Sequence, residues 1–350
     1  MRIVINGLGG VPTPPVQYGG IERGNVHLIH GLQELGYHPQ LICKTGSTID
    51  CDNIMFPDYQ EGKTLLEAAE EQWGTFDIYH DSSCNGLLHY AAKETRPSFW
   101  TVHGIGGDGE LCAYLSQRSM QLSPQSDYGD LPYTLLGIEL PEYLPVAKED
   151  FIIFIGAAKR NNKYLHYFTA IAKAHNVRAV AIIPEICITG REYFDECRGE
   201  YPFEWVDGAD DSLKFEYLRR AKCVVHCSHD GTGDNPWQDA SPAVVLEGLA
   251  VGTPVIGNYS GGIPEMIQDG ITGFLVRDAE QAIEAYTRIE GIDPRICRDY
   301  VERERNHVVY AQRMVAVYEA LAGVTDYETR KRAITSIQGA IDSAGGEHRD

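Results

Sequence analysis

Residues 239–276 read DASPAVVLEGLAVGTPVIGNYSGGIPEMIQDGITGFLV, and this stretch decides the fold class. Ser241 followed by Pro242 predicts an N-cap and the first position of a helix that runs to about residue 251. Short apolar runs at 254–256 and 273–276 predict two strands. A helix followed by short buried strands is typical of an α/β fold, in which helices cover a parallel sheet.

The start of this helix has the chemistry of an anion site. Its first turn, from Ala243, offers backbone N–H groups and the positive end of the helix dipole, which suit a diphosphate. Asp239 lies just outside that end, and Glu247 lies within the apolar segment that follows. A buried carboxylate needs a hydroxyl or N–H partner. Glu247 therefore either binds sugar and ribose hydroxyls together with Asp239, or forms a structural salt bridge in an ordinary capped helix.

Outside this stretch, strands and helices alternate along most of the chain, which predicts βαβ units and two parallel sheets. The pattern blurs through residues 111–143 and restarts with the apolar run 151–155 after Pro145. We expect strands at 2–6, 40–43, 76–80, 98–102, 151–155, 177–183 and 222–227. We expect helices at 21–35, 65–71, 161–174, 212–220 and 305–322. The chain then divides into a first domain at 1–147, a second at 148–304 and a C-terminal segment at 305–350.

Composition excludes several classes of function. The chain has 350 residues and a formal net charge of −20, so it is a poor candidate for binding nucleic acid or for docking a basic face on an anionic membrane. An anionic ligand must be held by local donors, because the overall field repels it. Nine cysteines, an odd number, and the absence of a signal sequence at the start predict a reduced, cytoplasmic protein.

The stretch 239–276 resembles the donor-site signature of the retaining glycosyltransferases of family four, members of glycosyl transferases group 1 with the GT-B fold. Residues 247–256, 261–265 and 269–276 match successive parts of the family pattern, and Asp239 stands where the family has its first glutamate. The resemblance implies that Asp239 contacts donor-sugar hydroxyls and that Glu247 contacts the ribose. It also implies donor contacts from the rest of this stretch, at Ser241, Pro242, Ala243, Gly262 and Glu265.

The first half of the chain carries a second part of the resemblance. Gly19 and Gly20, within 18–23, match the family's glycine-rich loop, where glycines let the backbone approach a ligand closely. Residues 77–80 and 101–104 resemble the next two strand ends, which in the family face the inter-domain cleft. The resemblance implies that His103 contacts the donor sugar near the reacting centre. His80 is a weaker candidate, and either histidine is otherwise structural.

One feature of the family is missing. The family has an arginine directly after the glycine of the first strand of the second domain and a lysine five residues later, both on the diphosphate. Here Ala157 follows Gly156, and Asn162 stands at the lysine position. Lys159, Arg160 and Lys163 lie in the same loop and either supply the charge from shifted positions or form a solvated basic loop. Arg23 is the next candidate for that charge.

Two other patterns do not predict sites. Cys223, His226, Cys227 and His229 lie on and just after an apolar strand, where alternation directs side chains to opposite faces, so no metal site is expected. The turn Gly7-Leu8-Gly9-Gly10 has the wrong glycine spacing for a dinucleotide fingerprint, and Pro12 interrupts the following helix start.

The sequence therefore predicts a GT-B hexosyltransferase with two Rossmann-like domains facing a central cleft and a C-terminal helix crossing back to the first domain. It would move a sugar from a UDP- or GDP-hexose to a hydroxyl acceptor, a glycan, a lipid-linked sugar or a small molecule, with retention and with no required cofactor. A divalent metal is compatible with this chemistry and is not implied. The alternatives are a nucleotide-sugar binding module without catalysis and a GT-B sugar-nucleotide epimerase, with a dehydrogenase as a distant third.

Overall fold

The computed structural model describes residues 1–104, 107, 109–124, 126–159, 163–189, 191–229 and 238–345. The chain forms two compact units. Unit 1 comprises Met1–Pro15, Gly19–Glu139 and Glu304–Asp350, and unit 2 comprises Val16–Tyr18 and Leu140–Arg303. The first unit ends at Glu139, earlier than the expected boundary at 147/148. The connection 141–150 contains no helix or strand, so the restart of the apolar pattern at 151 marks a strand and not the change of unit.

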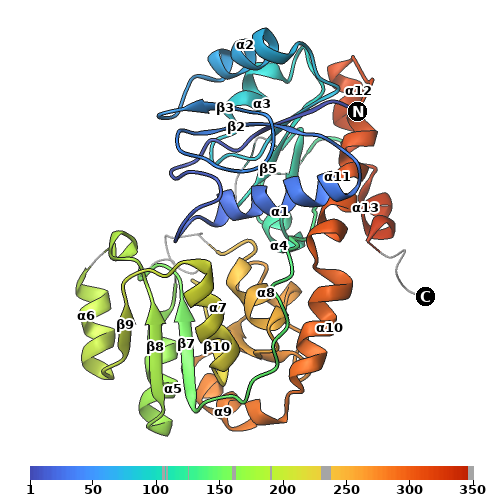
Figure 1. Ribbon diagram of the computed structural model, residues 1–350. Coiled ribbons are helices and arrows are strands. Elements are labelled where there is room, and N and C mark those ends of the chain that lie inside the picture. Colours follow the sequence, from blue (N-terminus) through green and yellow to red (C-terminus); the bar gives the residue numbers. More distant parts are fainter. Residues whose placement is uncertain are drawn as a thin grey trace. The chain divides into compact units, whose positions relative to one another are not determined.

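Unit 1 is built on a six-stranded sheet with the order β3-β2-β1-β4-β5-β6. Figure 1 labels β3, β2 and β5 of this sheet. Every adjacent pair is parallel, and β1 and β4 lie side by side at the centre. The strands are β1 Ile3–Asn6, β2 Gln40–Lys44, β3 Asn53–Phe56, β4 Ile78–Asp81, β5 Ser98–Val102 and β6 Cys112–Tyr114.

Unit 2 is built on a second six-stranded parallel sheet, with the order β12-β11-β10-β7-β8-β9. Counted from the first strand of each unit, both sheets have the order 3-2-1-4-5-6 of doubly wound dinucleotide-binding folds. The predicted pair of Rossmann-like sheets is confirmed. The strands are β7 Phe151–Ile155, β8 Arg178–Ile182, β9 Glu204–Val206, β10 Cys223–His226, β11 Val255–Asn258 and β12 Gly273–Val276.

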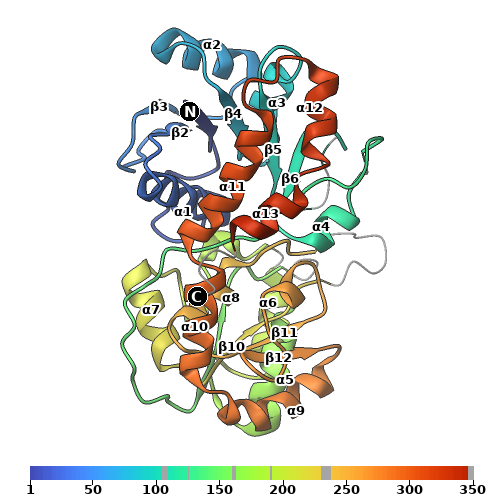
Figure 2. The same ribbon diagram turned by 90° about the vertical axis from the view of Figure 1, so that its right-hand side faces the viewer.

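Helices cover the sheet of unit 1, and the C-terminal helices belong to this unit (Figure 2). Helix α11 packs along α1, and the two approach most closely at Gly31, where a Cβ atom would lie 2.3 Å from the His307 carbonyl oxygen. The helices of unit 1 are α1 Gly20–Glu34, α2 Gly62–Trp73, α3 Leu87–Ala92, α4 Gln117–Gln121, α11 His307–Leu321, α12 Tyr327–Ile334 and α13 Gln338–Ala344.

The helices of unit 2 alternate with its strands. They are α5 Leu165–His175, α6 Arg191–Glu200, α7 Asp211–Arg220, α8 Ala243–Ala250, α9 Ala279–Arg288 and α10 Pro294–Glu304, with single 3-10 turns at η1 Glu185–Cys187, η2 Ile263–Glu265 and η3 Ile289–Gly291. Helix α5 begins later than the predicted start at 161. Lys163 and Tyr164 are bonded to the end of β10 and cannot join the helix.

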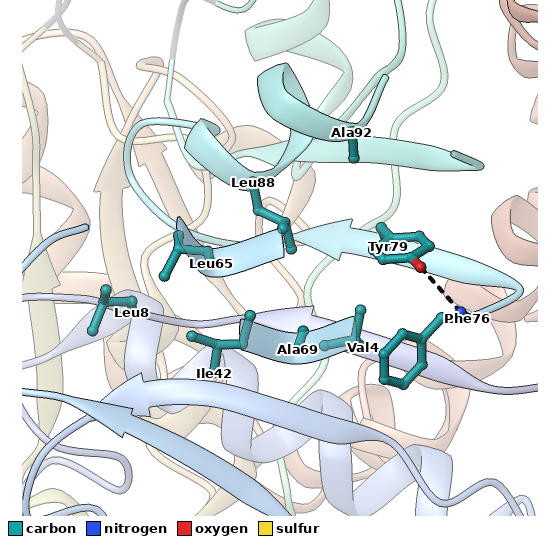
Figure 3. Packing of buried hydrophobic residues seen from close by; sticks show 9 residues of the cluster. All are labelled: Val4, Leu8, Ile42, Leu65, Ala69, Phe76, Tyr79, Leu88 and Ala92. Carbon is teal, nitrogen blue, oxygen red and sulfur yellow. Dashed lines mark hydrogen bonds between the residues drawn. The ribbon is translucent and has the colours of Figure 1, made fainter. Parts of the chain in front are cut away.

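The core of unit 1 forms between its sheet and the helices α2 and α3 (Figure 3). Val4, Ile42 and Tyr79 project from neighbouring strands, and they are nearly free of solvent contact. The Tyr79 hydroxyl accepts a hydrogen bond of 3.1 Å from the Phe76 N–H and donates to Glu70. Burial of each large apolar side chain stabilises the fold by about 1.5–3 kcal/mol.

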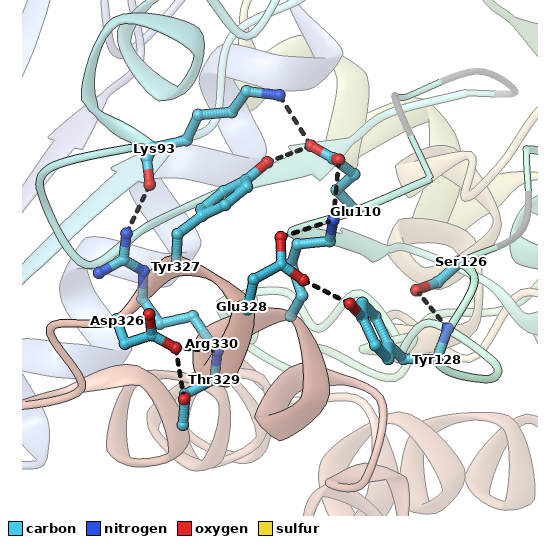
Figure 4. Close-up of polar contacts among 10 residues, drawn as sticks. Lys93, Glu110, Ser126, Tyr128, Asp326, Tyr327, Glu328, Thr329 and Arg330 are labelled. Atoms are coloured by element: carbon cyan, nitrogen blue, oxygen red, sulfur yellow. Dashed lines mark hydrogen bonds and ion pairs between the residues drawn. The ribbon is translucent and has the colours of Figure 1, made fainter.

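Helix α12 is held to unit 1 by polar contacts (Figure 4). Arg330 is completely buried and donates to the carbonyl oxygens of Lys93, Val324 and Thr325. Glu110 forms ion pairs with Lys93 at 2.8 Å and with Lys331 at 3.2 Å. The segment after Thr325 thus continues as the helices α12 and α13, with α12 anchored by buried polar contacts.

Three short strands were not expected from the sequence: β3, β6 and β9. Each has three or four residues, and β3 and β9 lie at the outer ends of partly exposed sheet edges. Edge strands bury only part of their surface, so they carry weak apolar periodicity.

Candidate functional site

The candidate site of unit 2 lies at the point where the strand order reverses. The neighbours β7 and β10 lead to opposite halves of the sheet, and ligands bind in such folds outside the carboxyl ends of the strands at this point. The loop after β7 carries Lys163, and β10 ends with His226. The loop that follows the adjacent strand β11 contains Gly261 and Gly262.

Lys163 is fixed by hydrogen bonds of its own loop. Its N–H donates to the Lys159 carbonyl oxygen at 2.9 Å, it forms an isolated bridge with Ser228, and the next N–H, of Tyr164, donates to Cys227 at 2.8 Å. These bonds hold the backbone of Lys163 beside the end of β10. The Lys163 side chain is buried, with a relative exposure of 10%.

Asp239 is held by the loop after β11. The Gly262 N–H donates to the Asp239 carbonyl oxygen at 2.9 Å, and the Gly261 N–H donates to the Gln238 side chain at 2.8 Å. Gly261 has φ +51°, and a Cβ atom there would lie 2.0 Å from the Asp239 carbonyl oxygen. Only glycine fits this close approach, which explains the first glycine of the Gly261-Gly262 pair.

These positions bring Lys163, Asp239 and His226 together. The Lys163 ammonium forms an ion pair with Asp239 Oδ2. The His226 Nε2 atom lies 3.3 Å from Lys163 Nζ and 3.4 Å from Asp239 Oδ2. Burial lowers the pKa of Lys163 to about 7, and burial together with the Lys163 cation holds the pKa of His226 well below its usual range. The imidazole is therefore neutral at pH 7.

Glu247 forms a second buried ion pair. Its Oε1 atom lies 2.6 Å from Lys214 Nζ, and each side chain is 7% exposed. Lys214 also lies 2.9 Å from Asp211, one turn earlier on α7. Among the residues that the structure describes, Glu247 Oε2 has no hydrogen-bond partner in the protein. The ion pair thus fixes one carboxylate oxygen of Glu247. The other oxygen can accept hydrogen bonds from hydroxyl groups of a ligand.

The helix start differs from the prediction in one respect. Helix α8 begins at Ala243, and Pro242, in an extended conformation, is the residue before it. Ser241 is therefore not the N-cap, and its hydroxyl points to the sulfur of Met266 at 3.8 Å. The N-cap residue Pro242 makes no side-chain hydrogen bond to the first turn of α8. The first-turn N–H groups keep their capacity to bind an anion.

The remaining predicted donor residues of unit 2 have different environments. Lys159 is exposed, and Arg160 lies outside the described residues, as does Asn162. Glu265 ends the turn η2 and is partly exposed. Among the described cations of the loop after β7, which are Lys159 and Lys163, the structure brings Lys163 to Asp239.

Aromatic side chains border Lys163. Tyr164 stacks on Tyr167 with ring centroids 5.6 Å apart and lies 5.6 Å from the His229 ring. Tyr164 and His229 are half-buried, so their rings reach the surface beside the ion pair. Such rings can support the flat face of a base or a sugar.

Sequence reasoning missed Lys214 and considered His226 only as a metal ligand. Lys214 and Leu218 lie one turn apart on α7 and are both buried, so a lysine on the apolar face of the predicted helix 212–220 was the available signal. The contact between His226 and Lys163 carried no sequence signal, because 63 residues separate them.

In unit 1, the predicted glycine-rich loop leads directly into α1. Gly19 precedes the helix and Gly20 is its first residue. A Cβ atom at Gly19 would lie 2.7 Å from Pro15. A Cβ atom at Gly20 would have no other atom within 4 Å. The Glu22 carboxylate is buried beside this loop and accepts from the Val11 N–H at 3.4 Å. Burial raises the pKa of Glu22.

The two candidate histidines of unit 1 differ. His103 follows β5, and its Nε2 atom lies 3.2 Å from both the hydroxyl and the carbonyl oxygen of Ser82. His80 is completely buried, and its two nitrogens contact Tyr318 at 3.0 Å and Thr101 at 2.7 Å. His80 therefore has the structural role that was its alternative, because both of its nitrogens are engaged inside unit 1. Burial lowers the pKa of His103 to about 4 and that of His80 to about 3.

Other features of the described residues bear on function. They contain no group of three or more His, Cys, Asp or Glu side chains placed to hold a metal ion. Among these same residues, no helix combines the length and the apolar character needed to cross a membrane. A cavity lined by Lys148, Lys222 and Pro254 lies at the amino ends of β7, β10 and β11, the edge opposite to the site.

Comparisons with known proteins agree with this fold. Residues 149–290 match the family model described as glycosyl transferases group 1. No curated protein matches the chain. Among solved structures, AviGT4, a glycosyltransferase involved in avilamycin A biosynthesis, is similar with a TM-score of 0.74 and 23% identity, over 91% of this chain and 97% of AviGT4.

Two further structures are similar over almost their whole length. Sucrose-phosphate synthase from Thermosynechococcus elongatus has a TM-score of 0.70 and 18% identity, over 91% of this chain and 98% of that one. HepE from Anabaena, in complex with UDP-glucose, has a TM-score of 0.68 and 15% identity, over 92% of this chain and 100% of that one. The group 1 match at residues 149–290, together with the fold of the whole chain, supports a GT-B glycosyltransferase.

Proposed function

We propose that this protein is a retaining hexosyltransferase that moves a sugar from a nucleoside-diphosphate sugar to a hydroxyl acceptor. One observation carries the proposal. Within the segment that matches group 1, a buried lysine and a carboxylate, Lys163 and Asp239, meet at the switch point of the sheet. The uncapped start of α8 follows Asp239 within a few residues. A diphosphate needs a cation and N–H donors, and a sugar needs a carboxylate that accepts from its hydroxyls.

The proposed roles follow from these contacts. Lys163 and the first turn of α8 hold the diphosphate, Asp239 accepts from the sugar hydroxyls, and Glu247 Oε2 accepts from the ribose. The acceptor oxygen bonds to the anomeric carbon on the face that the diphosphate leaves. The bond from that carbon to the diphosphate oxygen breaks, and the diphosphate takes the acceptor proton. Catalysis is then mainly positioning and stabilisation of leaving-group charge.

The donor screen begins with UDP-glucose, because HepE was solved with that ligand. Thermal shift with UDP, GDP, ADP and their hexoses identifies the base, since a ligand at a hundred times its Kd adds about 2.7 kcal/mol of stability. Incubation of the best donor with a panel of hydroxyl acceptors then tests transfer, and NMR of the product gives the anomeric configuration. An inverted product would refute retention.

The same experiments separate the alternatives. A binding module gives a thermal shift with neither transfer nor slow donor hydrolysis. An epimerase converts the donor without an acceptor. A dehydrogenase gives a shift with NAD, which we do not expect. If no sugar nucleotide or nucleoside diphosphate shifts the melting temperature, the proposed donor site is wrong.

Glu247→Gln tests the ribose contact with little change of shape. Because uridine and UDP share the ribose, this variant is expected to weaken both by about tenfold or more, as hydrogen bonds to charged groups contribute about 1.5–3 kcal/mol. Glu284→Gln, on the exposed face of α9, is the matched control and should leave both affinities unchanged. Unchanged affinity in Glu247→Gln would assign Glu247 to the structural salt bridge alone.

A further inference from the structure

His226 occupies a place that the proposed donor chemistry does not explain. It is the last residue of β10, the central strand of unit 2 beside the switch point, and its side chain is 2% exposed. Three separate elements bring the groups around it: the loop after β7 places Lys163, the loop after β11 holds Asp239, and β10 itself places the imidazole. The contact is therefore built by the fold and not by one flexible segment.

The hydrogen-bond capacity of His226 is limited. A neutral imidazole has one N–H donor and one lone pair. A lysine ammonium only donates and a carboxylate only accepts, so Nε2 serves Lys163 with its lone pair or Asp239 with a proton, one at a time. The other nitrogen, Nδ1, is buried without a hydrogen-bond partner among the described residues. An unsatisfied buried polar atom costs about 1–3 kcal/mol, so a functional reason for this histidine is expected.

A comparison with Lys214 shows what the imidazole does. Lys214 is flanked by two carboxylates, at 2.6 Å and 2.9 Å, which hold its charge in the protein. Lys163 forms an ion pair with Asp239, and the His226 imidazole, which is uncharged, lies 3.3 Å from its ammonium. A second carboxylate at position 226 would bind the ammonium much more strongly than a neutral acceptor does. The imidazole thus accepts from Lys163 without placing a second negative charge beside the ammonium.

We propose that His226 is a positioning residue, which holds the Lys163 ammonium through a neutral Nε2 acceptor so that Lys163 can bind the donor diphosphate. This inference rests on the proposed function. His226 touches neither the donor nor the reacting atoms. It acts through Lys163, and its loss should affect diphosphate binding more than nucleoside binding.

Two substitutions test the acceptor atom. His226→Leu has a similar volume and no acceptor, whereas His226→Gln has an amide that both accepts and donates and does not ionise. We expect His226→Leu to raise the Kd of UDP, or of GDP if that base is selected, by about tenfold and to leave the Kd of the matching nucleoside unchanged. We expect His226→Gln to keep the Kd of the diphosphate within about threefold of the parent. His175→Leu, on α5, controls for loss of a half-buried histidine in the same unit.

The kinetic readout separates positioning from proton transfer. His226→Leu should raise the KM of the donor with a smaller effect on kcat, and His226→Gln should show the same pH profile as the parent. Loss of one limb of that profile in His226→Gln would instead make His226 a general acid or base and would overturn the proposal. Two binding results would also overturn the proposal. One is that His226→Leu binds the diphosphate as tightly as the parent does, and the other is that His226→Gln binds it as weakly as His226→Leu.

A measurement without any nucleotide keeps the two proposals distinguishable. Mass spectrometry can follow acetylation of Lys163 as a function of pH in the parent and in both variants. Removal of the acceptor destabilises the ammonium, so the midpoint should fall in His226→Leu and stay in His226→Gln. If no nucleotide binds the parent but this midpoint shifts as expected, the donor function fails and the contact stands. If the midpoint is the same in all three proteins, the positioning role fails even where the parent binds UDP.

Discussion

The two sheets have the same strand order, but the side chains at their carboxyl edges differ in chemistry. In unit 1, Asp81 at the end of β4 is completely buried and accepts from four neutral donors on Asn6, Ser83 and His89, at 2.6–3.1 Å. In unit 2, the corresponding edge holds two carboxylates that are paired with buried lysines. Asp81 in unit 1 is thus held by neutral donors, whereas the two carboxylates of unit 2 are each paired with a cation.

His80 and His226 also differ in their hydrogen-bond partners. Both nitrogens of His80 have partners inside unit 1, and Nδ1 of His226 in unit 2 has none among the described residues. A fold positions strand ends, and the side chains placed there decide what they bind. This difference in charge is the reason why the proposed function assigns the diphosphate to unit 2.

The largest expected effect is on the buried ion pair between Lys214 and Glu247 in unit 2. Lys214→Met leaves the Glu247 carboxylate buried without its cation, which should cost about 3–5 kcal/mol of the free energy of unfolding. Urea unfolding followed by far-UV circular dichroism measures it. Lys173→Met, which removes an exposed lysine paired with exposed Glu200, should have no measurable effect.

The double variant Lys214→Met/Glu247→Leu sharpens this test. Because both charges are removed, it should recover most of the stability that the single variant loses. A single variant as stable as the parent would show that the pair is solvated, and the contrast between the two edges would then rest on Lys163 and Asp239 alone.

The next effect concerns binding at the other pair. Lys163→Met should weaken binding of UDP, or of GDP if that base is selected, by about 1.5–3 kcal/mol, or about tenfold to 150-fold, and leave nucleoside binding nearly unchanged. Because Lys163 is buried, high salt should not abolish the difference. Lys159→Met, in the same loop but exposed, is the control and should have a small, salt-sensitive effect. Isothermal titration with the nucleotide and nucleoside decides between them, and equal effects of the two variants would contradict the assignment.

Because burial lowers the pKa of Lys163 to about 7, binding of the diphosphate should depend on pH. Above pH 7 part of the free protein holds a neutral amine, and a bound diphosphate favours the ammonium. Binding should therefore take up protons and weaken as pH rises above 7. Titrations in buffers of different ionisation enthalpy measure this uptake, which should vanish in Lys163→Met.

A further prediction concerns His80 at the carboxyl edge of the sheet in unit 1. Its pKa is lowered to about 3 in the folded state, so the folded protein disfavours the proton that an unfolded histidine binds below about pH 6.5. Its contribution to stability is complete above pH 6.5 and is lost as pH falls toward 3, by about 2 kcal/mol at pH 5. His80→Phe should reduce the stability difference between pH 7.5 and pH 5 by that amount, as urea unfolding at both pH values will show. The exposed His38→Gln is the control, and an unchanged pH dependence in His80→Phe would mean that the ring is protonated when folded.

The smallest effect is expected from a substitution at Gly261, in the loop whose backbone holds Asp239. Gly261→Ala forces a side chain into the left-handed region at φ +51° and against the Asp239 backbone, which should cost about 1–2 kcal/mol of stability and weaken donor binding. Gly270→Ala is the matched control, because Gly270 has φ +75° with no atom within 4 Å of its Cβ position. It shares the backbone strain and should leave donor affinity intact. Equal donor affinity in the two variants would show that the position of Asp239 does not depend on Gly261.

The sequence alone predicted much of this protein. Apolar runs such as 151–155 and 273–276 coincide with β7 and β12, because buried parallel strands are short and continuously apolar. The sequence also singled out Glu247, since a carboxylate within an apolar helix is costly without a partner. It singled out Asp239 by its place just before the helix start and by the family resemblance. Apolar strands and carboxylates near a helix start can be predicted because the spacing of nearby residues in the sequence identifies them.

Tertiary structure decided which partners those carboxylates have. Lys214 was not predicted, because the contact with Glu247 joins helices 33 residues apart in sequence. The choice of Lys163 over Lys159 depends on hydrogen bonds to the end of β10, which no local pattern encodes. The Ser241 cap was wrong, because Pro242 stays extended and the helix begins one residue later.

The same reason explains the fates of the histidines. His80 and His226 both end up inside parallel sheets near strand ends, and the sequence ranked them by motif resemblance and by metal-ligand spacing. Their roles were set by residues from other elements, Tyr318 of α11 for His80 and Lys163 of the loop after β7 for His226. Periodicity determines which side chains are buried, and only the packing of distant segments determines which of them meet.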